Sequence, residues 1–143
     1  HRELITAQPA CLPLLRQLCD AGYSVSLETS GALDISQVDA RVIKVLDLKT
    51  PGSGEVAANR YQNLNHLAPR DQVKFVICDR ADYEWARDQI DERRLVGRCE
   101  LLFSPAYQQQ DATQLAEWVL ADRLPVRVQM QLHKLLWGDE PGR

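Results

Sequence analysis

Several features that mark whole classes of proteins are missing from this sequence. No apolar segment reaches the roughly 18 residues that a membrane span requires, and the first ten residues hold no apolar signal-peptide region. Like charges form no long block, and the net charge is −3. A dedicated nucleic-acid binder would show a strong basic excess. We therefore expect a cytoplasmic protein with no membrane and no nucleic-acid partner.

Cysteine is scarce and scattered. The four cysteines are Cys11, Cys19, Cys78 and Cys99, with no CxxC pair and no histidine at zinc-finger spacing. Cysteines without such spacing usually behave as small apolar residues, so we expect free and mostly buried thiols. Common nucleotide and hydrolase motifs are also missing: the sequence has no GxGxxG, GxxxxGK[ST], HExxH or GxSxG.

The 143 residues have the length of one ordinary domain, and we expect one, over residues 1–143. After a loose lead-in over His1–Gln8, apolar runs that suit buried strands alternate with segments of helical periodicity. The expected strands are Tyr23–Leu27, Val42–Leu48, Gln72–Cys78, Glu100–Phe103 and Val126–Leu132. The expected helices are Pro9–Gly22, Val56–Leu67, Arg80–Glu92 and Asp111–Leu120. This alternation predicts an α/β protein with a mostly parallel sheet.

Each expected strand finishes in polar residues, which lie either in its last positions or just after it. They are Glu28 and Thr29, Asp47 and Lys49, Cys78 and Asp79, Ser104 and Tyr107, and Gln131 and His133. Carboxyl ends of parallel strands share one edge of the sheet, where α/β proteins bind ligands. Any α/β fold shows some of this pattern. The loop Pro51–Gly54 lets the backbone approach a bound group closely, unless it is an ordinary surface loop.

Two lysines, Lys44 and Lys74, interrupt apolar strands. A buried ammonium is costly unless an anion accepts it. Either a carboxylate of the protein does so, for example Glu28 for Lys74, or an anionic ligand does. His133 is either a proton donor and acceptor near neutral pH or a structural residue. The one basic cluster, Arg93 with Arg94 and Arg98, suits a solvated helix end.

Five segments together resemble the 7-carboxy-7-deazaguanine synthase family. They are LETSG at 27–31, KVLDLKTPGSGE at 44–55, DQVKFVICDRADYEWA at 71–86, FSP at 103–105 and QLHKLLWGDEPGR at 131–143. The resemblance implies an incomplete (β/α) barrel that works as a homodimer. It implies a radical ring contraction of 6-carboxy-5,6,7,8-tetrahydropterin to 7-carboxy-7-deazaguanine, with S-adenosylmethionine, a 4Fe-4S cluster and Mg²⁺ as cofactors.

The resemblance also implies positions for the site. The residues expected beside S-adenosylmethionine are Glu28, Thr29, Ser30, Asp47, Leu48, Lys49, Lys74, Ser104, Pro105, Ala106 and Tyr107. Those expected beside the pterin are Gln131 and His133. No residue of this chain is assigned a catalytic role.

Some of the family's features have no counterpart here. The cysteines lack the CxxxCxxC spacing of the cluster ligands, and the Gly-Gly-Glu-Pro segment, the Mg²⁺-contacting threonine and the substrate-binding arginine of the family's N-terminal third are absent. The chain resembles the C-terminal two thirds of the family, so its barrel is expected to be truncated at the N-terminus. A cluster needs its ligands, so this chain alone should not catalyse the radical reaction. It is expected to be a portion of the synthase or a truncated, non-catalytic S-adenosylmethionine- or pterin-binding or assembly module.

Overall fold

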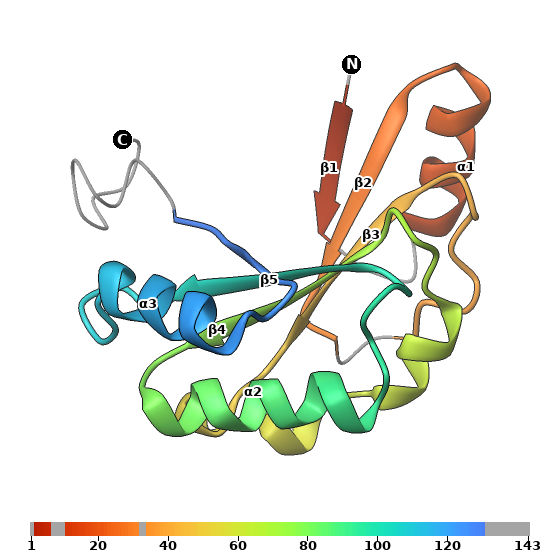
Figure 1. The fold of residues 1–143 in the computed structure, drawn as a ribbon. Coiled ribbons are helices and arrows are strands. Elements are labelled where there is room, and N and C mark those ends of the chain that lie inside the picture. Colours follow the sequence, from red (N-terminus) through yellow and green to blue (C-terminus); the bar gives the residue numbers. More distant parts are fainter. Residues whose placement is uncertain (1, 7–10, 32–33, 131–143) are drawn as a thin grey trace.

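The computed structural model describes residues 2–6, 11–31 and 34–130, the first of these segments by its backbone alone. Strands and helices alternate through most of the chain (Figure 1). The strands are β1 (Arg2–Thr6), β2 (Ser24–Thr29), β3 (Ile43–Leu48), β4 (Gln72–Ile77), β5 (Glu100–Pro105) and β6 (Arg127–Val128). The α-helices are α1 (Leu12–Asp20), α2 (Arg80–Glu92) and α3 (Ala112–Asp122). Three 3₁₀ helices, η2 (Pro51–Ser53), η3 (Val56–Ala58) and η4 (Tyr61–His66), join β3 to β4.

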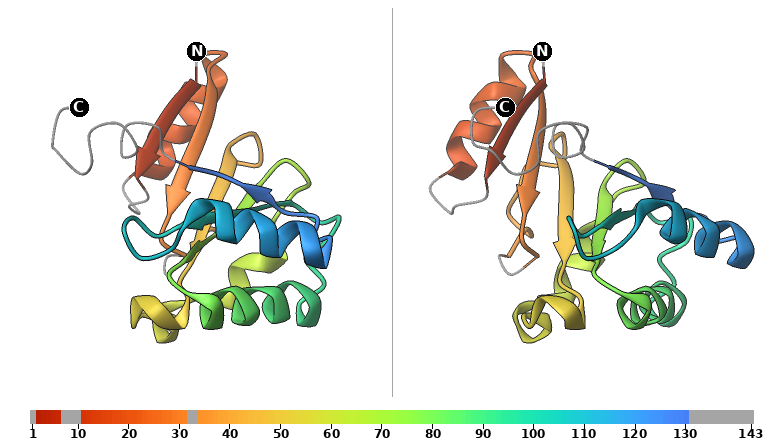
Figure 2. Two further views of the ribbon diagram at one scale, coloured as in Figure 1. Left: turned by 60° about the vertical axis from the view of Figure 1, so that its left-hand side comes forward. Right: turned by 90° about the vertical axis from the view of Figure 1, so that its left-hand side faces the viewer.

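The strands form one sheet in the order β1-β2-β3-β4-β5-β6, and every neighbouring pair is parallel. The three α-helices lie around the outside of this curved sheet (Figure 2). Within the described residues β1 and β6 are the two edges and do not pair, so the sheet is open. The α/β class and the parallel sheet are confirmed. The incomplete barrel stays a prediction.

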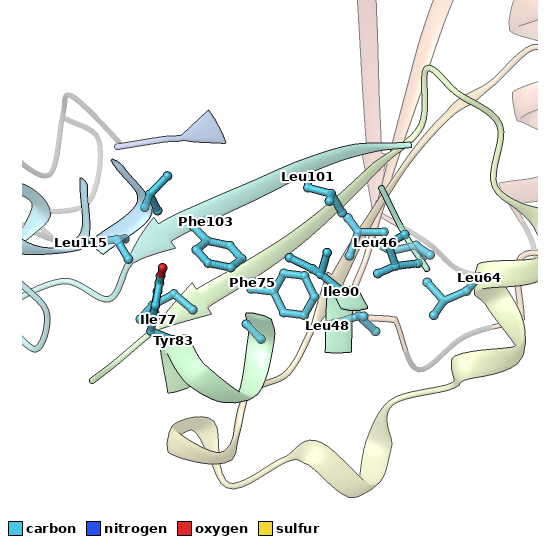
Figure 3. Close-up of a cluster of buried hydrophobic side chains, with 14 of the residues drawn as sticks. Leu46, Leu48, Leu64, Phe75, Ile77, Tyr83, Ile90, Leu101, Phe103 and Leu115 are labelled. Atoms are coloured by element: carbon cyan, nitrogen blue, oxygen red, sulfur yellow. The ribbon is translucent and has the colours of Figure 1, made fainter. Parts of the chain in front are cut away.

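The core lies between the sheet and the helices. Alternate residues of the strands point to the helix side, and those of β3, β4 and β5 pack against α2 and α3 (Figure 3). Phe75 meets Phe103 edge to face at 5.6 Å, and Phe103 meets Tyr83 of α2 at 5.8 Å. A smaller cluster joins Leu15 of α1 to β2. The covered face is therefore apolar and closely packed.

Two helix starts follow the sequence prediction. The carboxylate of Asp79 accepts a hydrogen bond from the Asp82 N–H at 2.8 Å, and that of Asp111 accepts one from the Gln114 N–H at 2.9 Å. Both are N-caps, which satisfy an otherwise unpaired donor in the first helical turn. No helix among the described residues has both the length and the apolar character to cross a membrane.

Two local predictions were wrong. The segment expected as a loose lead-in contains strand β1. The segment expected as a helix over Val56–Leu67 is divided between η3 and η4, because Asn59 adopts an extended backbone between them. The strand expected over Val126–Leu132 is confirmed in its described part as the short strand β6, which pairs with β5 at the edge of the described sheet.

Candidate functional site

The carboxyl ends of β2, β3, β4 and β5 share one edge of the sheet, here called the rim. Because side chains alternate along a strand, Glu28, Asp47, Lys74 and Ser104 point to the face without helices, called the open face. Register supports this placement, since Asp47 lies opposite Lys74 on the neighbouring strand. Thr29 and Leu48 point to the helix side and are buried. The rim groups predicted from the described residues therefore share an edge, although not all share a face.

A cavity of about 550 Å³, the rim cavity, opens at the ends of β4 and β5. Its lining includes five residues that the sequence assigned to the site: Lys74, Ser104, Pro105, Ala106 and Tyr107. Sequence reasoning missed the residues that complete it: Val76, Gln108, Gln109, Gln110, Asp111, Ala112 and Met130. The other described site residues, at the ends of β2 and β3, do not line this cavity. Gln131 and His133 lie outside the described residues.

The two strand lysines have different surroundings. Lys44 Nζ lies 3.3 Å from Asp71 Oδ2, and both side chains are buried, so the protein's own carboxylate accepts this ammonium. Lys74 is half-buried and forms no ion pair with Glu28 or with any other carboxylate of the described residues. The pairing of Lys74 with Glu28 is therefore not found. Its ammonium is available to an anion in the rim cavity.

Only one of the two carboxylate oxygens of Asp47, at the end of β3, has a hydrogen-bond partner among the described residues. Its Oδ2 accepts a hydrogen bond from Lys49 Nζ at 3.1 Å. Its Oδ1 is buried and has no hydrogen-bond partner among the described residues. An unsatisfied buried acceptor costs about 1–3 kcal/mol. The arrangement therefore suits a ligand that brings an N–H or O–H donor to this oxygen.

The glycine-rich loop after β3 packs against the protein itself. Asp82 of α2, almost fully buried, accepts hydrogen bonds from the Thr50 hydroxyl at 2.9 Å, the Gly52 N–H at 2.8 Å and the Cys78 N–H at 3.0 Å. A Cβ on Gly52 would lie 2.5 Å from Asp82 Oδ2. Gly52 is thus required by the approach of Asp82, and the approach of this loop to a bound group stays a prediction.

Two asparagines fix the neighbouring rim segments. The side-chain amide of Asn59 accepts from the Lys49 N–H at 2.8 Å and donates to the Lys49 carbonyl at 2.9 Å. Asn63 accepts from the Ile35 N–H at 3.1 Å and donates to the Gly31 carbonyl at 3.4 Å. Both asparagines lie in the segment expected as a helix, and their spacing of four residues gave no signal of this bridging role.

Gly31 brings the loop after β2 close to β3. Its φ is +81°, and a Cβ there would lie 3.0 Å from the Asp47 carbonyl oxygen. A left-handed backbone with this contact favours glycine. The glycine of the ETSG segment therefore serves the packing of two adjacent rim segments.

All four cysteines are free, as predicted, but each is half-buried where mostly buried thiols were expected. Burial, with the neighbouring Asp82 carboxylate, raises the pKa of the Cys78 thiol to about 11. Burial likewise raises the pKa of Cys99 to about 11. Metal-bound cysteine is a thiolate. Among the described residues no group of three histidine, cysteine or acidic side chains is placed so that it could hold a metal ion, so this part of the chain does not fit a cluster site.

Comparison with known proteins identifies the family. Proteins named 7-carboxy-7-deazaguanine synthase are 39% identical in Koribacter versatilis, with 96% of this chain and 67% of the relative aligned, and 42% identical in Chlorobaculum tepidum, with 93% and 62% aligned. The chain belongs to the 7-carboxy-7-deazaguanine synthase family. A synthase of that name from Methanospirillum hungatei is 34% identical over 86% of this chain and 50% of its own length. This family member thus spans from half to two thirds of these relatives. No protein-family model matches it.

Proposed function

We propose that this chain forms the S-adenosylmethionine- and pterin-facing wall of a 7-carboxy-7-deazaguanine synthase in queuosine and 7-deazapurine biosynthesis. The complete enzyme would convert 6-carboxy-5,6,7,8-tetrahydropterin to 7-carboxy-7-deazaguanine. The observation that carries the proposal is the rim cavity, because it is lined by the β4 and β5 residues that the family resemblance assigns to the cofactor.

The chemistry of the open face supports a zwitterionic ligand such as S-adenosylmethionine. The Lys74 ammonium, without a described carboxylate partner, would attract the ligand's carboxylate. Asp47 Oδ1 would accept a hydrogen bond from an amine or hydroxyl of the ligand. Pro105 and Ala106 add apolar surface to the cavity wall. When bound, S-adenosylmethionine would supply the radical that begins the ring contraction, and the residues named here would bind and orient it.

The remaining family features are proposed on the resemblance. Residues 1–143 would form one partial (β/α)-barrel domain that works as a homodimer in the cytoplasm, and the open parallel sheet with outer helices is consistent with that fold. The described residues do not fit a 4Fe-4S cluster, and Mg²⁺ has no assigned ligand in this sequence. We derive no step through either group from this chain.

A second candidate is a non-catalytic S-adenosylmethionine- or pterin-binding or assembly module of the same fold. The observation that favours it is that no described group of three histidine, cysteine or acidic side chains could hold a metal ion, whereas a cluster enzyme needs cysteine ligands for its cluster. Both candidates predict ligand binding at the rim. They differ in whether the radical reaction takes place there.

The binding test is calorimetric titration of the purified 143-residue chain with S-adenosylmethionine. We expect saturable binding that the substitution Lys74→Met weakens about tenfold, since a hydrogen bond to a charged group contributes about 1.5–3 kcal/mol. The matched control is Arg16→Gln, which removes an exposed positive charge on α1 and should bind as the wild type does. Absence of binding, or equal weakening in both variants, would contradict the site.

Anaerobic iron–sulfide reconstitution with and without an added cluster-binding segment then separates the two candidates. We expect that this chain alone acquires no iron–sulfur absorbance band, because its cysteines do not converge. Supplying the cluster-binding segment of a relative as a separate polypeptide should give turnover of the carboxy-tetrahydropterin if the chain is a synthase portion. Retained S-adenosylmethionine binding without turnover would instead identify the non-catalytic module.

A further inference from the structure

A second cavity, here called the outer pocket, has a volume of about 600 Å³ and lies between the C-terminal end of α2 and η4. Its walls carry Tyr61, Gln62, Asn65, Glu92, Arg93 and Arg98. No residue lines both this pocket and the rim cavity. The outer pocket is therefore a separate feature that neither the family resemblance nor the proposed function uses.

Arg93 is held in place with most of its donors unused. Its guanidinium carbon lies 3.6 Å from the centre of the Tyr61 ring, a stacked cation–π contact. Its Nε donates to Gln89 Oε1 at 2.7 Å. Its two Nη groups donate to no acceptor among the described residues. A guanidinium carries five N–H donors in a rigid plane, so stacking fixes this plane and leaves one edge available.

Arg98, the second arginine of the pocket, is held by two hydrogen bonds to backbone carbonyls. Its Nη2 donates to the Leu64 carbonyl at 2.6 Å, and its Nη1 donates to the Arg93 carbonyl at 3.2 Å. These bonds join η4 to the end of α2 and fix the guanidinium through neutral acceptors. Its charge is therefore not neutralised, and each Nη keeps a second N–H.

The charge balance of the pocket is positive. Within the described part of the chain, neither Arg93 nor Arg98 has a carboxylate within ion-pair distance, and Glu92 is the single acid of the lining. Two fixed guanidinium groups match oxyanions that carry two or more negative charges, because each can donate paired N–H bonds. The side-chain amides of Gln62 and Asn65 can add donors. We propose that the outer pocket binds a multivalent oxyanion, the group shared by phosphate esters and polycarboxylates.

The adjacent Arg94 provides a matched control. It is exposed and does not line the pocket, although it belongs to the same basic cluster in the sequence. If the basic cluster were only a solvated helix end, its three arginines would be equivalent. The structure places Arg93 in the pocket and Arg94 outside it. Arg93→Gln and Arg94→Gln therefore change the net charge equally, but only Arg93→Gln removes a pocket donor.

The test is calorimetric titration of the 143-residue chain at low ionic strength, with pyrophosphate and citrate as probes and acetate as a monovalent comparison. We expect saturable binding of at least one multivalent probe, little binding of acetate, about tenfold weaker binding by Arg93→Gln, and unchanged binding by Arg94→Gln. If pyrophosphate binds and citrate does not, the ligand is of the phosphate type. If citrate binds and pyrophosphate does not, the ligand is a polycarboxylate.

A second variant guards against loss of folding. Arg98→Lys keeps the charge but removes the forked donor, so we expect weaker binding by a chain whose thermal transition remains cooperative. The proposal is overturned if neither multivalent probe binds saturably, or if Arg93→Gln and Arg94→Gln weaken binding equally, because the response would then follow net charge alone. Since the readout involves no S-adenosylmethionine, its failure leaves the rim unaffected.

Discussion

The two faces of the sheet treat the same kind of residue in opposite ways. On the helix-covered face, Lys44 is buried and Asp71 accepts its ammonium, while the Asp71 carboxylate also accepts the N–H groups of Lys44 and Ala68. On the open face, Lys74 lines a cavity and has no described carboxylate partner. The covered face therefore uses its lysine for structure, and the open face leaves its lysine for a ligand.

The difference shows that a lysine within an apolar strand does not by itself indicate a site. An ammonium whose partner is already fixed contributes to stability, and removing that partner leaves a buried charge. An ammonium that has no carboxylate partner in the protein can bind an anionic ligand. Partner and face decide between the two roles, and only the three-dimensional structure supplies both.

The largest effect should come from breaking the buried pair. Asp71→Asn removes the charge that compensates Lys44, and we expect it to lower the free energy of unfolding by about 3 kcal/mol. Urea denaturation measures the loss. Asp91→Asn, an exposed acid near the end of α2, is the control and should change stability little.

On the open face the corresponding change should be small. Lys74→Met removes a cation that has no carboxylate partner among the described residues, so we expect the free energy of unfolding to change by less than about 1 kcal/mol. A loss as large as that of Asp71→Asn would show that both lysines are structural and would remove the contrast between the faces.

An intermediate effect should come from Asp82, which supports the rim without an ion pair. Asp82→Ala leaves the Gly52 and Cys78 N–H groups and the Thr50 hydroxyl without their acceptor. We expect unfolding to be easier by about 2 kcal/mol. Asp88→Ala on the exposed side of the same helix serves as the control. If Asp82→Ala and Asp88→Ala have the same urea midpoint, the hydrogen bonds of Asp82 do not contribute to stability.

The smallest effect concerns the helix layer and pH. The Tyr83 hydroxyl and the Arg87 guanidinium donate to Asp122 and hold its pKa below the usual range for aspartate. A folded-state pKa below the unfolded value contributes stability above about pH 4, and this is lost as pH falls through the folded pKa. Asp122→Asn should therefore make the urea midpoint less sensitive to acid. An unchanged slope between about pH 5 and pH 3 would contradict this assignment.

Sequence patterns predicted what depends on local chemistry. The starts of α2 and α3 and the strand over β4 follow from helical periodicity and from an apolar run, both of which are set within a few residues. The shared edge of the strand ends follows from parallel pairing. The covered lysine's partner did not follow, because Asp71 lies 27 residues from Lys44 along the chain.

The errors share a physical cause. Tyr61, Leu64 and Leu67 repeat at helical spacing, but Asn59 and Asn63 use their amides to bind the backbone at Lys49 and Gly31. Those long-range bonds fix an irregular path that local periodicity cannot show. Likewise, the function of Gly52 depends on Asp82, which is brought to it by the following helix.

The bidentate contact of Asn59 with the Lys49 backbone has a consequence for recognition. The end of β3 acquires its shape when the chain folds, so a guest molecule would encounter a preorganised surface and spend little conformational entropy on arranging it. The host needs no further ordering, so a rigid analogue should gain affinity only through the conformational entropy that the guest itself no longer loses on binding.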